Sequence, residues 1–438
     1  MAEFKDIASR AIEVAQKQGA DAVYASVARS QDVEAQWRKS KVDTLSSAGQ
    51  SSLVLRLFVD GKYGVYTTSD LRDESVDAFI GKGIAMTRLL ERDPARGLAD
   101  PSRYTGRAEL DLEQYDETVA ALRPDDLVQK CRQFEDVALA RKDISPIDTT
   151  ISFGATVNES FSATSNGFYG SRKTTLAMSM CEYVVGNGEK KISEYGYSQA
   201  KHASDMEPFE VQAADAARYI ALKTDQKKIA SGRRTLILDR RCAGQFVGRF
   251  IIPAFGNALV NRQSYFEGKI SQTVASKLFD LHDSPHLVRG MRSRLYDGEG
   301  MATQPRAIFD HGVLTQYYLD NYSARKLGLD ATTGEQTNLV LTPGARGLDE
   351  MIRDVQDGVY VISFLGGNQD TVRGDFSYGI VGVAIEHGEL TTHVSEMNVT
   401  GNFMDVMHRL NEVGNDPRTD VSSRIPSLRI DDVSFSGT

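Results

Sequence analysis

Cysteine is scarce in this chain of 438 residues, and its three copies lie far apart, at positions 131, 181 and 242. An odd number of widely spaced cysteines favours neither a disulfide framework nor a metal site made from cysteine pairs. Long apolar runs are also missing, because the longest, Phe250–Phe255, is far too short to cross a bilayer. The first residues lack the basic stretch and the apolar core of a secretion signal. We therefore expect a protein of the reducing cytoplasm that does not associate with a membrane.

Positive charge is not in excess either. The formal net charge is −9, whereas a dedicated nucleic-acid binder needs a positive field to neutralise phosphates. The apolar fraction of 41% and the charged fraction of 25% are typical of a globular protein, which excludes disorder, collagen and coiled coil as the dominant class. We expect no direct binding of nucleic acid.

Familiar catalytic motifs are absent from the sequence. It has no Gly-x-Ser-x-Gly elbow, no Walker sequence, no three-glycine dinucleotide fingerprint and no His-Glu dipeptide. His282 and His286 are spaced as on a helix, but Pro285 between them disrupts such a helix, so we expect a loop with exposed imidazoles. Ser323 and Lys326 match a Ser-x-x-Lys pair, yet so short a pattern is expected by chance. We interpret Ser323 as the cap at the start of a helix.

The order of periodic segments predicts an α+β fold. The predicted helices cover residues 3–18, 74–91, 124–141 and 207–229, and the predicted strands cover 22–29, 32–39, 51–59, 235–238, 359–365, 380–386 and 390–396, with a strand-rich stretch at 149–200. Residues 1–230 are expected to form an N-terminal α/β region of antiparallel or mixed sheet, with sub-regions of about 1–107 and 108–230. Residues 231–438 are expected to form a larger, glycine-rich domain of mixed sheet, whose polar tail from residue 416 either docks or frays.

Glycine and polar residues cluster in the second half of the chain, at 296–300, 320–328, 366–368, 373–377 and 396–402. Glycine lets backbone approach backbone or ligand closely, and a neighbouring strand edge can pair with an extended peptide. Structural turns explain the same glycines equally well, and Asp297 and Glu299 could satisfy backbone donors in such a turn. The spacing does not separate a peptide groove from a set of turns.

The order of these clusters resembles the TldD/PmbA family, for which an older label is modulator of DNA gyrase. The matching pieces are Asp-Gly-Glu-Gly at 297–300, the stretch with Ser-Ala-Arg-Lys-Leu-Gly at 318–328, Gly-Asp-Phe-Ser at the start of 374–382, Ile-Glu-x-Gly at 385–388 and Gly-Asn-x-x-Asp at 401–405. The N-terminal half fits through Gly-Ala-Asp at 19–21, Val-Asp-Gly-Lys at 59–62 and Thr-Ser-Asp-Leu at 68–71. The resemblance covers nearly the whole chain, and the ordered set is specific although each piece alone is not.

The resemblance implies two kinds of subunit. TldD-like members carry His-Glu-x-x-x-His on a helix of the C-terminal domain, plus a late cysteine, and hold the catalytic zinc. PmbA-like members, also called TldE, lack these ligands and pair with a TldD-like chain in a cytoplasmic metalloprotease that acts on unstructured peptides. In this chain the metal segment would follow the strand at 235–238, but no His, Glu or Asp occurs from 242 to 262 and no cysteine follows Cys242. The chain thus resembles the PmbA type, with no catalytic residue and no metal ligand of its own.

From this resemblance we expect the chain to help form the substrate cleft and to hold the peptide as an extended strand. The residues expected to line that cleft are Arg373, Asp375, Phe376, Ser377, Asn368 and Asn402. Arg373 departs from the family, because many relatives have threonine there. The expected partners are a TldD-like subunit, which supplies the zinc, and an unstructured peptide, with a homodimer as the alternative when the chain is alone.

Two other functions stay open. One is an independent hydrolase, whose metal site is assembled from distant histidines such as His282, His286 and His311. The other is a non-enzymatic regulator that binds a protein such as DNA gyrase.

Overall fold

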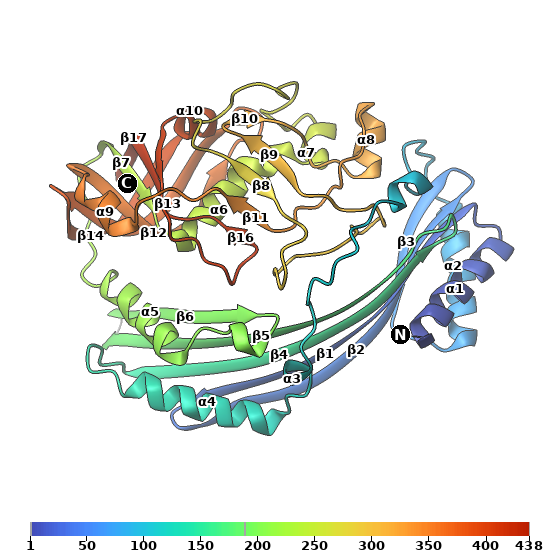
Figure 1. The fold of residues 1–438 in the computed structure, drawn as a ribbon, viewed down its shortest axis with the longest axis horizontal. Coiled ribbons are helices and arrows are strands. Elements are labelled where there is room, and N and C mark those ends of the chain that lie inside the picture. Colours follow the sequence, from blue (N-terminus) through green and yellow to red (C-terminus); the bar gives the residue numbers. More distant parts are fainter. Residues whose placement is uncertain (1, 188–189, 438) are drawn as a thin grey trace.

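The computed structural model describes residues 2–187 and 190–437 and confirms the α+β class (Figure 1). The first half forms one long antiparallel sheet with the strand order β3-β2-β1-β4-β5-β6. Its strands are β1 (Ala22–Arg38), β2 (Lys41–Val59), β3 (Lys62–Thr68), β4 (Asp148–Thr164), β5 (Tyr169–Asn187) and β6 (Lys190–Ala200), and its helices are α1 (Ala2–Lys17), α2 (Asp73–Thr87), α3 (Glu117–Ala120), α4 (Pro124–Leu139) and α5 (Phe209–Ala221). Figure 1 shows the sheet as a curved layer, with α1, α2 and α4 on its outer side and the C-terminal half facing its inner side.

The two faces of this sheet differ because successive side chains of a strand point in opposite directions. On β1, Val23, Ala25 and Val27 are fully buried in a cluster with α1 and α2. Farther along the same strand, Ala35 and Trp37 are buried in a cluster with α4 and α5. The outer face of the sheet is therefore apolar. The residues between these positions point to the inner face.

Strand β1 is longer than the sequence predicted. The break expected at residues 30 and 31 is wrong, because Ser30 pairs with Gln50 of β2 and with Asn158 of β4. The backbone N–H and C=O groups of Ser30 are thus paired on both sides of the strand. A polar side chain does not interrupt a strand where it points to a face of the sheet that no helix covers. Strand β2 is also longer than predicted and begins at Lys41, because its first half pairs with β1.

The second half contains a mixed sheet that closes on itself. Its order is β14-β13-β12-β7-β17-β15, and β14 also pairs with β17. These strands are β7 (Gly232–Leu238), β12 (Asp357–Gln369), β13 (Asp375–Glu386), β14 (Glu389–Asn402), β15 (Leu410–Val413) and β17 (Leu428–Gly437), and they are joined by α6 (Arg240–Ile251), α9 (Leu348–Arg353) and α10 (Phe403–His408). The polar tail thus docks, because β17 pairs with β7, β14 and β15.

A smaller sheet lies beside the closed one, in the order β10-β9-β8-β11-β16. It consists of β8 (Leu281–Asp283), β9 (Arg306–Asp310), β10 (Val313–Leu314), β11 (Leu339–Leu341) and β16 (Ser423–Arg424), with α7 (Gly256–Val260) and α8 (Asn321–Leu327) nearby in the chain. The helix predicted over 207–229 is too long, since α5 ends at Ala221 and Lys227 already pairs with Val394 of β14.

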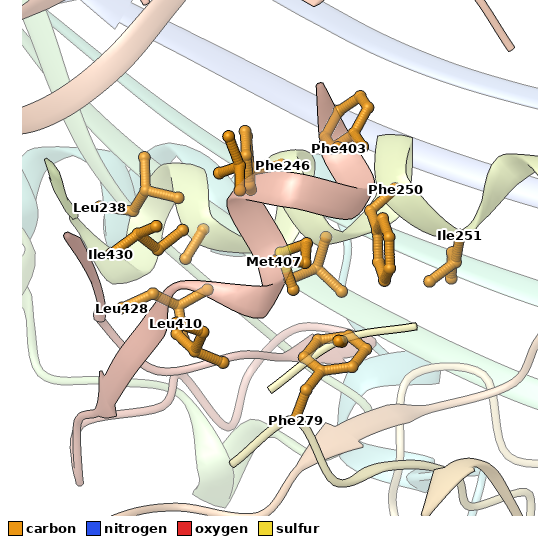
Figure 2. Packing of buried hydrophobic residues seen from close by; sticks show 14 of the residues in the cluster. Leu238, Phe246, Phe250, Ile251, Phe279, Phe403, Met407, Leu410, Leu428 and Ile430 are labelled. Carbon is orange, nitrogen blue, oxygen red and sulfur yellow. The ribbon is translucent and has the colours of Figure 1, made fainter. Parts of the chain in front are cut away.

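Helix α6 lies at the centre of the largest apolar cluster described (Figure 2). Its Phe250 is fully buried, with a ring centroid 5.5 Å from that of Phe279 and 6.0 Å from that of Phe403 in α10. Figure 2 shows Phe246 and Phe250 pointing into the space between α6 and α10. Within the described residues, the structure has no helix that is both long and apolar enough to cross a membrane.

Candidate functional site

Helix α6 follows β7 directly and is anchored by Asp239. The Oδ1 atom of Asp239 accepts a hydrogen bond from the backbone N–H of Arg241 at 2.7 Å and so caps the helix. The same carboxylate, which is 1% exposed, accepts the hydroxyl hydrogen of Tyr219 in α5 at 2.8 Å and that of Tyr360 in β12. The pKa of both tyrosines is raised, mainly by burial and secondly by the negative charge of Asp239. Both tyrosines therefore keep the proton that they donate. Asp239 therefore ties the N-terminal half to the start of α6.

The side chains of α6 fill the core or carry positive charge. Cys242 is buried, and its thiol donates to the carbonyl of Val361, with 3.3 Å between sulfur and oxygen. Burial raises the pKa of this thiol well above its usual value, so it is protonated at neutral pH. In the last turn of α6, the guanidinium carbon of Arg249 lies 3.9 Å from the ring centroid of Tyr378 in β13. This region of α6 thus presents a cation stacked on an aromatic ring.

Three of the residues predicted to line a cleft meet where β13 begins and β14 ends. The Nδ2 atom of Asn402 donates to the carbonyl of Arg373 at 2.8 Å and to Oδ1 of Asp375 at 3.0 Å. Its Oδ1 accepts from the backbone N–H of Met404 at 3.0 Å and caps α10. Gly374 completes the turn with a φ of 93°, a conformation that favours glycine. Asn402 therefore holds an exposed turn that carries Arg373.

The other three predicted residues have different surroundings. Asn368 faces Ser377 across the β12–β13 register, at the same end of the strands. Phe376 is 5% exposed, and its ring centroid lies 4.5 Å from that of Phe403. Phe376 is therefore a core residue, and its expected place in a peptide-lining surface is not supported by the packing. Burial follows from strand alternation, which turns this side chain inward while its neighbours point out.

The Asp-Gly-Glu-Gly segment is a structural turn. Oδ1 of Asp297 accepts from the backbone N–H groups of Glu299 and Met301, each at 2.9 Å. The Glu299 carboxylate accepts from the N–H of Asn321 at 2.8 Å, at the start of α8. Burial raises the pKa of Asp297 to about 6 and that of Glu299 to about 7. The interpretation that both carboxylates satisfy backbone donors is confirmed.

Helix α8 begins one turn earlier than the sequence suggested. The cap is Asp320, whose Oδ1 accepts from the N–H of Ser323 at 2.7 Å, so the expectation that Ser323 is the cap is wrong. Ser323 is buried within the first turn. From the last turn, Arg325 donates to the carbonyl of Leu98 at 2.8 Å. The helix therefore fastens the connection after α2 to the C-terminal half.

The histidines considered for an independent metal site lie in two places. His282 is in strand β8, with Nε2 3.0 Å from Oδ1 of Asp280, and not in the expected loop, because its backbone pairs with β9 and β11. Among the described residues, Asp280, Asp310 and His311 form a group whose ligand atoms all lie within 4.8 Å of one another. His286 lies apart, bonded to a threonine hydroxyl.

Comparison with family models covers most of the chain. The model of PmbA/TldA metallopeptidase domain 1 matches residues 23–87, the central domain matches 117–223, and the C-terminal domain matches 231–437. The chain belongs to the PmbA/TldD metallopeptidase family.

Relatives of this PmbA/TldD member match over its full length. A crystal structure from Bacteroides thetaiotaomicron, described as a candidate modulator of DNA gyrase, is 37% identical, covers 100% of both chains and has a TM-score of 0.96. The metalloprotease PmbA of Escherichia coli O157:H7 is 24% identical, over 99% of this chain and 96% of that protein. TldE from Thermococcus kodakarensis shares the fold, with a TM-score of 0.86 at 19% identity, covering 98% of this chain and 100% of that one.

The family model is that of a metallopeptidase, and α6 follows β7, where the resemblance implies the metal ligands of a TldD-like chain. Zinc is bound by thiolate, imidazole or carboxylate groups. Along α6 the chain offers instead a buried, protonated thiol at Cys242 and the guanidinium of Arg249. These groups do not fit a zinc ion.

One feature of this PmbA/TldD member was not predicted. A cavity of about 570 Å³ lies between the inner face of the long sheet and loops of the C-terminal half, and it is lined on the sheet side by Asn158, Ser160, Arg172 and Thr174. Alternation along β4 and β5 could have placed these four side chains on one face. The loops that close the cavity, at 291–294 and 334–336, are too distant in sequence for any local pattern to find.

Proposed function

We propose that this chain is the metal-free partner subunit of a two-subunit zinc peptidase of the cytoplasm, in which a TldD-like chain supplies the metal and the chemistry. The observation that supports the proposal is the chemistry of α6, which has a buried thiol and a stacked arginine where the resemblance implies the metal ligands of a TldD-like chain. The fold shared with TldE from Thermococcus kodakarensis supports the same role.

The contribution of this chain would be to shape the cleft for an unstructured peptide. The exposed turn held by Asn402 presents Arg373 at the tip of β13, and Asn368 and Ser377 lie at the same end of the strands. An extended peptide can add to an unpaired strand edge through its backbone, with polar side chains setting its orientation. Among the described strands, β12 beyond Val361 pairs only with β13, so its other edge near Asn368 is open to such a peptide. We assign no catalytic residue to this chain.

A reconstitution assay tests this proposal. A TldD-like subunit from the same organism is mixed with this chain, and cleavage of an unstructured peptide is followed. We expect little cleavage by either protein alone and strong cleavage by the mixture, because the cleft is complete only in the complex. Arg373→Ala is expected to reduce the gain several-fold at unchanged melting temperature, whereas Lys5→Ala, on exposed α1, serves as the matched control. Cleavage by the TldD-like chain at the same rate without this protein would refute the partner role.

Two other functions each have one observation in their favour. The description of the Bacteroides thetaiotaomicron relative as a candidate modulator of DNA gyrase favours a non-enzymatic regulator. The group of Asp280, Asp310 and His311 favours an independent metal-dependent hydrolase. Hydrolysis by this chain alone that is lost in Asp280→Ala would support the hydrolase, and gyrase binding without any effect on peptide cleavage would support the regulator.

A further inference from the structure

The floor of the cavity between the sheet and the C-terminal half is formed by strands β4 and β5. Across the β4–β5 register Asn158 pairs with Thr174 and Ser160 pairs with Arg172, so the four polar side chains lie side by side on the inner face. Lys201, immediately after β6, is held by its carbonyl, which accepts the hydroxyl hydrogen of Thr175 at 2.8 Å. The floor is therefore polar, and a hydrogen bond fixes the backbone at Lys201.

The charge of this cavity is strongly unbalanced. Four basic residues line it, namely Arg172, Lys201, Arg292 and Arg294, whereas Glu335 is the one acidic residue among its described lining residues. Glu335 is already paired with Arg294. Arg172 lies with its guanidinium carbon 4.1 Å from the ring centroid of Tyr296 and donates to that residue's carbonyl, so its position is fixed without a carboxylate. The cavity thus has about three positive charges without an anionic partner in the described structure.

Lys201 is the most unusual of these residues. It is 9% exposed, and no carboxylate among the described residues acts on its amine. Burial lowers the pKa of its amine, because the charged form has lost water without gaining an anion. An anion that enters the cavity would supply the missing partner and stabilise the charged form of the amine.

The cavity is larger than a single small ion requires. A second cavity of about 430 Å³ shares five lining residues with it, Gln114, Arg172, Thr174, Ser293 and Arg294. This second space is lined by Leu110, Leu112 and Leu295 and also by charged Asp111, Glu113 and Lys173. Glu113 is paired with Arg289 at 2.7 Å, and Lys173 is paired with Glu159. The two spaces together offer a cationic end and a more apolar end, which suits a chain that bears a carboxylate and apolar side chains.

We propose that this cavity binds a carboxylate of an acidic, unstructured peptide, with Lys201, Arg172 and Arg292 around the anion. The peptide character of the ligand rests on the proposed function, whereas the anionic character rests on the cavity alone. Bidentate and charge-assisted hydrogen bonds from these groups give the selectivity for a carboxylate.

The test is a binding titration of the full chain with a fluorescently labelled, glutamate-rich unstructured peptide and with its glutamine counterpart. We expect the glutamate peptide to bind at least about tenfold more tightly, and Lys201→Met to remove most of that difference. Lys201→Met also removes a buried charge, so it is expected to melt no lower than the parent chain. Lys82→Met, the same change on an exposed residue of α2, is the control and should leave binding unchanged.

Each result decides the inference. Equal affinity for the two peptides, or unchanged affinity in Lys201→Met, would overturn it. Arg292→Gln, an exposed position, repeats the test with a variant that leaves the fold untouched. Competition by inorganic phosphate with no binding of either peptide would assign the cavity to a small anion and overturn the peptide ligand. Because binding is measured without the TldD-like subunit, selective binding together with a failed reconstitution would refute the partner role alone.

Discussion

Replacing Asp239 with alanine is expected to lower the free energy of unfolding by about 3–5 kcal/mol. The carboxylate is buried and receives hydrogen bonds from the hydroxyls of Tyr219 and Tyr360 and from the backbone N–H of Arg241. Alanine would leave two buried hydroxyl groups without an acceptor and remove the cap of α6. Urea unfolding followed by circular dichroism measures the loss.

A double-mutant cycle identifies the cause of this loss. In a Tyr219→Phe background the additional cost of Asp239→Ala should be smaller by about 1–2 kcal/mol, because one of the orphaned donors is already gone. Asp239→Asn, which keeps an acceptor oxygen, should cost less than alanine. A loss below about 1 kcal/mol for Asp239→Ala would show that this residue does not anchor α6.

The stability of the protein is expected to fall as the pH rises from about 5 to about 8. The folded-state pKa values of Asp297 and Glu299 are raised to about 6 and about 7, so the folded chain holds protons that the unfolded chain has released. The stabilisation that these two groups contribute is fully present below their unfolded-state pKa values, near 4. It is lost as the pH rises through their folded-state pKa values. Together they should account for roughly 2–4 kcal/mol of this decline.

The matched variant for this prediction is Glu299→Gln. It keeps an oxygen that can accept the N–H of Asn321 but cannot ionise, so the decline between about pH 5 and pH 8 should shrink by about 2 kcal/mol. Urea midpoints measured across this pH range in both proteins give the comparison. Parallel pH profiles would contradict the assignment of the raised pKa to Glu299.

Periodic apolar patterns predicted the main elements of the fold. The helix at 124–141 and the strand at 235–238 correspond to α4 and β7. The apolar residues of α4 face one cluster, whereas those of β7 are buried on both faces of the sheet. Polar interruptions were misleading. The break expected at Ser30 is absent, because its backbone pairs on both sides. The polar tail forms β17 because Leu428 and Ile430, and after a register shift Val433 and Phe435, are buried in the closed sheet.

The candidate site was only partly accessible from the sequence. The glycine-rich clusters were found, yet their roles depend on contacts between distant segments, such as Glu299 with the start of α8 and Asn402 with the turn at Arg373. The burial of Phe376 was not foreseen, because a motif does not show which way a strand residue points. The cationic cavity escaped notice because Lys201 and Arg292 are ordinary basic residues until folding brings them together.

The zinc content of this chain, purified alone and dialysed beside its TldD-like partner, tests the central claim most directly. The account predicts no zinc above background in this chain and about one equivalent in the partner. About one equivalent of firmly held zinc in this chain, together with peptide cleavage in the absence of the partner, would contradict it.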